Sequence, residues 1–91
     1  MRYTWYDVSR GGQRRGATLQ AEDSLERVVV LALVEQDRGG RWWYEAVRGY
    51  NSTTGAYLMG PRVACTDEAD GRARALALLT PLFDLEEDQT G

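Results

Sequence analysis

The side chains of this sequence that could do chemistry are carboxylates, hydroxyls, arginines and one thiol, because the chain contains no histidine. Without histidine, the usual arrangements that activate a serine or cysteine nucleophile cannot be built, and most zinc sites lack a ligand. Cys65 has no second cysteine to pair with. A helix N-terminus beside it can lower the pKa of its thiol. We therefore predict a protein that is not an enzyme and that has no catalytic residues, cofactor or metal site.

Aromatic residues alternate with arginines along the segments that we expect to be strands. Trp, Tyr and Arg dominate the energetics of protein interfaces. Surface candidates of this kind for protein binding are Trp42, Tyr44, Arg48 and Tyr50, together with Arg10, Arg14 and Arg15 in a glycine-rich segment. The same rings equally suit a hydrophobic core. A third interpretation is a sheet that binds RNA or DNA, with rings that stack on bases and arginines that hold phosphates.

Acidic residues concentrate toward the C-terminus. Residues 1–65 hold nine arginines and seven acids, whereas residues 66–91 hold two arginines and seven acids. Such an asymmetry can mark an acidic interaction segment, although acidic residues also keep a protein in solution. The acidic candidates for binding are Asp67, Glu68, Asp70, Asp84, Glu86 and Glu87. Asp67, Glu68 and Asp70 lack the spacing of a calcium loop and are typical of a helix start.

These residues predict a small non-enzymatic protein-binding module. Its most specific form is an inhibitor from a phage or mobile element, of the anti-CRISPR or anti-defence kind, that occupies a surface of a larger nucleic-acid-handling complex. The partner would then be a protein or ribonucleoprotein. The alternatives are the RNA- or DNA-binding sheet and a self-associating structural protein. A homodimer formed through an exposed sheet face or the 56–65 edge is compatible with the binding module. Salt dependence separates charge mimicry from an interface that is anchored by aromatic rings.

Length and composition indicate one small domain over residues 1–91 that acts in the cytoplasm. The chain has 91 residues, and 43% of them are hydrophobic, which is enough for a core. The longest apolar run, residues 28–34, is far too short to cross a membrane. A single cysteine fits a reducing compartment.

The first half of the chain is typical of strands. We expect a strand at residues 2–8, a mobile surface turn at 9–16, a short strand at 17–20 and a turn at 20–24. Residues 26–36 are apolar on every side, and a strand or a helix over 21–36 fits them. Their valines, and the hairpin signal at 37–40, favour the strand. A four-residue loop then places Gln36 opposite Arg41 and Leu33 opposite Tyr44.

The second half predicts one more strand and a helix. A strand at 56–65 is interrupted by Gly60 and Pro61, which suits an edge. Thr66 is a suitable helix N-cap, and the expected buried face carries Ala69, Ala73, Leu76 and Phe83. Pro81 would kink or restart this helix, and an acidic tail at 86–91 would fray. The predicted fold is α+β, an antiparallel β-meander of about four strands with a C-terminal helix packed across one face.

Overall fold

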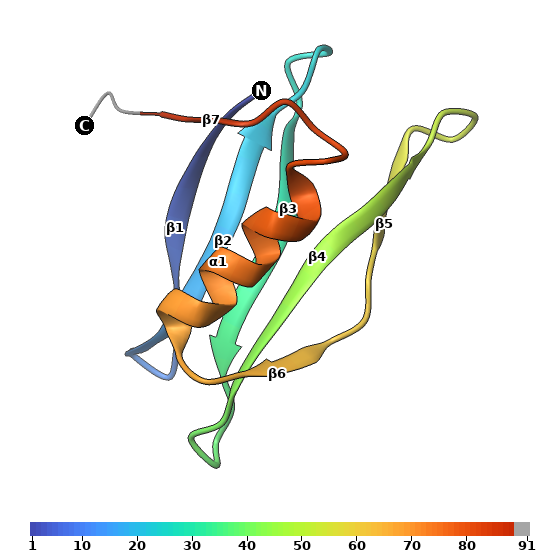
Figure 1. Cartoon of the computed structure of the whole chain (residues 1–91). Coiled ribbons are helices and arrows are strands. Elements are labelled where there is room, and N and C mark those ends of the chain that lie inside the picture. Colours follow the sequence, from blue (N-terminus) through green and yellow to red (C-terminus); the bar gives the residue numbers. More distant parts are fainter. Residues whose placement is uncertain (89–91) are drawn as a thin grey trace.

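The sheet and the single helix of this protein form two layers in a computed structural model that describes residues 1–88 (Figure 1). The described part is an α+β fold in which a seven-stranded, mostly antiparallel sheet carries one helix on one face. In chain order the elements are β1 (Arg2–Arg10), β2 (Gln13–Glu22), β3 (Val28–Gln36), β4 (Trp42–Asn51), β5 (Ala56–Met59), β6 (Val63–Cys65), α1 (Glu68–Leu79) and β7 (Glu86–Glu87).

The strands follow one another across the sheet in the order β5-β4-β3-β2-β1-β7. Strand β6 pairs with the first residues of β4, whereas β5 pairs with its last residues. The antiparallel meander with a helix across one face is therefore confirmed, but the strand number exceeds the four that were expected. The expected strand at 56–65 is divided into β5 and β6, because the segment around Gly60 and Pro61 leaves the ladder. The other addition is β7, which pairs in parallel with β1.

A tight turn joins β1 and β2, so the long mobile turn expected at 9–16 is wrong. Gly11 and Gly12 have φ values of 59° and 79°. A two-residue hairpin loop of type I′ has positive φ angles at both residues, which glycine adopts without steric cost. The ladder therefore reaches Arg10 and Gln13, and Arg10 and Arg14 project from strands.

Residues 28–36 form a strand, which decides the open question over 21–36, but its register with β4 differs from the expected one. Gln36 pairs with Trp42 and Val34 with Tyr44, a shift of one residue. The carboxylate of Asp37 accepts hydrogen bonds from the backbone N–H groups of Gly39 and Arg41, so the loop includes Arg41. A one-residue shift in one strand exchanges the faces on which its partners meet.

The helix begins one residue later than expected, and the expected buried face is correct only in part. The N-cap is Asp67, not Thr66, because the Asp67 carboxylate accepts a hydrogen bond of 2.8 Å from the backbone N–H of Asp70. Leu76 and Phe83 are half-buried and pack against the core as expected, whereas Ala69 and Ala73 are exposed. The buried positions are Gly71, Ala75 and Leu79, each one turn apart. The small residues Gly71 and Ala75 let the helix lie close to the sheet.

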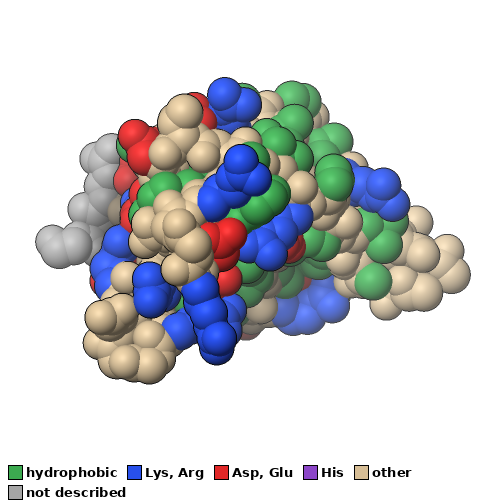
Figure 2. All heavy atoms as spheres, turned by 90° about the horizontal axis from the view of Figure 1, so that it is seen from below, with side chains coloured by type: hydrophobic (Ala, Val, Ile, Leu, Met, Phe, Trp, Pro, Cys, Tyr) green, Lys and Arg blue, Asp and Glu red, His purple; other side chains and the backbone are tan. Residues whose placement is uncertain are grey.

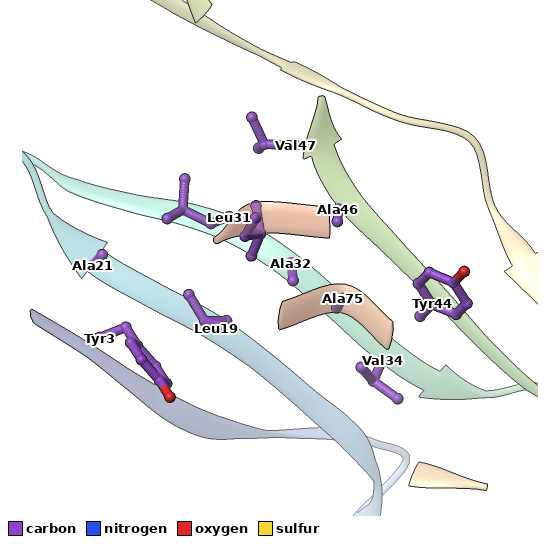
Figure 3. Packing of buried hydrophobic residues seen from close by; sticks show 11 residues of the cluster. Tyr3, Leu19, Ala21, Leu31, Ala32, Val34, Tyr44, Ala46, Val47 and Ala75 are labelled. Atoms are coloured by element: carbon purple, nitrogen blue, oxygen red, sulfur yellow. The ribbon is translucent and has the colours of Figure 1, made fainter. Parts of the chain in front are cut away.

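The core lies between α1 and the central strands. Figure 3 shows Ala75 of the helix over the sheet near Ala32 and Ala46, with Tyr3 and Tyr44 on either side of this centre. The buried cluster consists of Tyr3, Leu19, Ala21, Leu31, Ala32, Val34, Tyr44, Ala46, Val47, Ala75 and Leu79. The opposite sheet face has no helix over it among residues 1–88.

The chain after the helix neither continues as a helix nor frays at Glu86. The helix ends at Leu79 with Thr80 as its C-cap, and no second helix follows Pro81 in the described chain. The backbone N–H of Glu86 donates to the carbonyl of Met1, and that of Asp88 donates to the carbonyl of Tyr3. The predicted frayed tail is therefore wrong for residues 86–88, while residues 89–91 lie outside the described residues.

Candidate functional site

Arg14 and Glu68 lie at the centre of an ion-pair network that joins the β1–β2 hairpin to the start of α1. The two guanidinium Nη atoms of Arg14 donate to the Glu68 carboxylate at 2.6 and 2.8 Å, and its Nε donates to Asp7 at 2.8 Å. Arg72 pairs with the same Glu68 carboxylate and stacks on the Trp5 ring at 4.8 Å. The hydrogen bond from Arg14 is the main cause of the lowered Glu68 pKa.

The other acids of the helix start are also occupied within the fold. Asp67 caps the helix, and Asp70 accepts from the Thr66 backbone N–H and from Arg74, both at 3.0 Å. The hydrogen bond from Thr66, followed by that from Arg74, lowers the Asp70 pKa. These carboxylates stabilise the helix start and its junction with the sheet, so they offer little uncompensated charge to a partner.

The remaining acidic candidates lie elsewhere. Asp84 follows the helix, and Glu86 and Glu87 form β7 at the far edge of the sheet. Figure 1 shows β7 near the end of the molecule opposite to the first turn of α1. The structure therefore separates the acidic candidates into two groups and does not bring them together on one surface.

The arginines of the first hairpin are likewise placed apart. Arg10 donates to Glu35 of β3 at 2.7 Å, whereas Arg14 faces the helix. Arg15 is half-buried in β2, at the irregularity where the register between β1 and β2 shifts. The expected group of three open arginines is not present.

Two of the aromatic candidates contribute to the interior. Tyr44 is only 8% exposed and belongs to the core, and Trp42 packs against that core. The surface role expected for Tyr44 therefore does not fit its burial. A neighbouring ring that was not among the candidates, Trp43, lies under the guanidinium groups of Arg62 at 4.6 Å and Arg41 at 5.5 Å. Its indole N–H donates to Asp37 at 2.9 Å.

The β4–β5 hairpin exposes the last two candidates, Arg48 and Tyr50. The Tyr50 ring lies 4.9 Å from that of Tyr57, whose hydroxyl is 3.5 Å from the Asp23 carboxylate. Burial opposes the ionisation of Asp23, but hydrogen bonds from Arg27 and Leu25 outweigh it, so the Asp23 pKa is below its usual value. Arg48 makes no ion pair or hydrogen bond with any side chain of residues 1–88.

Cys65 does not have the activated thiol that its position near a helix start suggested. Burial raises the Cys65 pKa, and the negative charge of Asp70 adds to this effect. The Sγ atom is 3.5 Å from the carbonyl oxygen of Asp67 and donates to it. The thiol is therefore protonated at neutral pH and is a weak nucleophile.

An apolar groove of about 340 Å³ lies between the C-terminal end of α1 and the outer part of β4. Leu78 and Leu82 form one wall and are 53% and 49% exposed. The groove is lined by Ala46, Val47, Arg48, Gly60, Pro61, Val63, Leu78, Pro81 and Leu82. Figure 2 shows hydrophobic side chains gathered on the side of the molecule toward β5, with arginine and acidic side chains intermixed nearer the centre.

The local sequence explains why this groove is open. Gly60 and Pro61 interrupt the strand pairing with β4 between β5 and β6, and the Gly60 N–H donates to the Ala46 carbonyl at 2.8 Å. On the other side, the helix ends before Pro81, so Leu82 is not drawn into the helical face that packs on the sheet. Sequence periodicity missed both leucines because residues 76–85 contain apolar residues on all sides.

Chemically, this groove can accept an apolar side chain and, through Arg48, an adjacent anion. Within residues 1–88 there is no group of three or more His, Cys, Asp or Glu side chains that could hold a metal ion. No helix within that same part of the chain has the length and apolar character needed to cross a membrane.

No protein-family model, curated protein or solved structure matches the chain. The function is therefore argued from the geometry of these residues.

Proposed function

We propose that this chain is a non-enzymatic protein-binding module, and that it binds its partner through the apolar groove beside the end of α1. The observation that carries this proposal is the exposure of Leu78 and Leu82 next to an open apolar cavity. Contiguous exposed apolar surface with a polar rim is typical of a protein interaction site.

The cost of leaving this surface in water supports the same proposal. Burial of a leucine side chain contributes about 1.5–3 kcal/mol. Leu78 and Leu82 forgo much of this stabilisation in the isolated chain, although Leu79 between them is fully buried. A partner that covers both leucines would recover this stabilisation. We therefore assign their exposure to binding, because the fold itself does not require it.

The acidic residues give less support to a mechanism of phosphate imitation. Asp67, Glu68 and Asp70 are engaged in a cap or in ion pairs. Asp84, Glu86 and Glu87 belong to the other end of the molecule. We therefore propose that an inhibitor of the phage type, if the chain is one, occupies its target through apolar contact and not through a negatively charged surface.

An affinity-capture experiment with paired variants tests the proposal. Tagged wild-type protein and the double variant Leu78→Ser/Leu82→Ser are expressed in the source organism, and captured proteins are compared after nuclease treatment. The matched control is Leu25→Ser, because Leu25 is 68% exposed on the β2–β3 turn and does not line the groove.

We expect a stoichiometric partner with wild type and with Leu25→Ser that is absent with the double variant. A partner retained equally by all three proteins would contradict the groove as the binding site. Circular dichroism of each variant verifies that the fold is intact.

A second candidate function, binding of nucleic acid, is favoured by one observation on the helix-free sheet face. Arg10 and Arg62 line a hollow there with Trp43, and a basic and aromatic surface can hold phosphates and bases. Glu35 and Glu45 line the same hollow and reduce its attraction for phosphate. Fluorescence anisotropy with labelled single-stranded RNA and duplex DNA tests this function. If the protein binds nucleic acid through this hollow, Arg62→Glu should lose that binding.

A further inference from the structure

We infer that the partner segment that enters the groove is acidic as well as apolar: an apolar side chain occupies the cavity, and a neighbouring Asp or Glu pairs with Arg48. This inference rests on the proposed function and specifies the chemistry of the partner. Among the described residues that line the groove, Arg48 is the only charged one.

The first argument is the charge of the segment that forms the outer wall. Residues 46–64, which supply the end of β4, all of β5 and β6 up to Ala64, contain Arg48 and Arg62 and no acidic residue. The whole chain carries a net charge of −3, so this segment differs in sign from the rest of the molecule. Complementary charge selects partners and orients them at an interface.

The second argument is the state of Arg48 itself. Arg10, Arg14, Arg27, Arg72 and Arg74 each pair with a carboxylate within the chain. Arg48 has no such carboxylate among residues 1–88. Its fork of N–H donors is therefore open to a partner carboxylate, which it can hold in a bidentate pair.

The same charges argue against a second copy of this chain as the occupant. A symmetric dimer would place each copy of the positively charged 46–64 segment against the other. That interface would then hold Arg48 and Arg62 of both copies with no acidic residue from either 46–64 segment, and like charges in an interface oppose association. An acidic segment of another protein satisfies both the cavity and the arginine.

Selection from a random-peptide phage library tests the inference. Peptides are selected on wild-type protein and then sorted by binding to three variants: Leu78→Ser/Leu82→Ser, Arg48→Glu, and the control Arg38→Glu. Arg38 is an exposed arginine in the β3–β4 loop and does not line the groove, so the control reproduces the charge change elsewhere.

We expect enriched peptides that combine apolar residues with Asp or Glu and that require both leucines. Their affinity should fall roughly tenfold or more in Arg48→Glu, as expected for the loss of a charged hydrogen bond, and should not fall in Arg38→Glu. Added salt should weaken the binding of these peptides to the wild-type protein.

A failure of this inference can be distinguished from a failure of the proposed function. Groove-dependent peptides without acidic residues, with unchanged affinity for Arg48→Glu, would overturn this inference and leave the protein-binding function in place. An absence of peptides that depend on Leu78 and Leu82 would contradict both. Sedimentation of wild-type protein as a dimer that Leu78→Ser/Leu82→Ser dissociates would identify a second copy as the occupant and overturn the acidic partner.

Discussion

Gly71 shows how one residue sets the distance between the two layers of this fold. A Cβ atom at this position would lie 2.7 Å from Cγ1 of Val34 and 3.0 Å from Sγ of Cys65. Glycine ordinarily costs a helix about 1 kcal/mol relative to alanine. Here that cost is offset by close packing of α1 on β3, which a larger residue would prevent.

We therefore predict that Gly71→Ala destabilises the protein, against the usual helix preference. The added methyl group must displace buried atoms, and overpacking costs about 1–3 kcal/mol. Urea denaturation measures the change in the free energy of unfolding. Ala73→Gly, at an exposed helix position, is the control for propensity alone and should cost about 1 kcal/mol. A gain in stability for Gly71→Ala would show that the space between α1 and β3 accommodates the added methyl group.

Cys65 provides a second prediction at this scale. Because burial raises its pKa, its thiol should react with a disulfide reagent more slowly in the folded protein at pH 7.5 than in denaturant. Its rate should continue to rise as the pH passes 8.5. Equal rates for folded and unfolded protein at pH 7.5 would indicate an activated thiol and would reopen a chemical role.

At the scale of elements, the ion pair between Glu68 and Arg14 joins α1 to the β1–β2 hairpin. Its contribution to stability should depend on pH. The Glu68 pKa is lowered in the folded protein, chiefly by the hydrogen bond from Arg14. A carboxylate with a depressed folded pKa stabilises the fold above its unfolded pKa, about 4.3 for glutamate, and loses that effect as the pH falls through the folded pKa.

We predict that Glu68→Gln lowers the urea midpoint of unfolding at pH 7 and that the difference from wild type shrinks as the pH falls below about 4. Glu22→Gln, an exposed carboxylate near the end of β2, is the control and should change the midpoint little at either pH. A constant difference between wild type and Glu68→Gln from pH 7 to pH 3 would mean that the ion pair with Arg14 does not account for it.

The sequence predicted the elements better than it predicted their details. Valines in 28–34 indicated a strand, and the glycines after Asp37 indicated a hairpin, which is correct. The register was wrong by one residue because the hydrogen bonds of the Asp37 side chain close the loop and cannot be read from composition. The helix face was correct at Leu76 but wrong at Ala69 and Ala73, because contact through Gly71 and Ala75 leaves no strong apolar pattern.

At the scale of the whole molecule, residues that stabilise the fold and residues that we assign to binding alternate along one segment. Leu79 is fully buried, while Leu78 and Leu82 face the groove. We predict that Leu79→Ala costs about 2–5 kcal/mol of stability, as other buried leucines do. Leu82→Ala should cost less than about 1 kcal/mol, as surface changes do.

Chemical denaturation compares these two variants directly. Equal destabilisation would mean that Leu82 contributes to the core and that the groove is not an available surface. The sequence could not make this distinction, since both leucines occur in one apolar run and only the end of the helix before Pro81 separates them. Of the residues within 1–88 that line the groove, only Arg48 was predicted from the sequence to take part in binding.

Hydrogen–deuterium exchange of the protein, free and bound to its captured partner, tests the central claim most directly. Binding through the groove predicts slower amide exchange at 46–49, 60–63 and 78–82, with no change at 4–8 on β1. Protection confined to 4–8 and 28–33, in strand segments that do not line the groove, would contradict it.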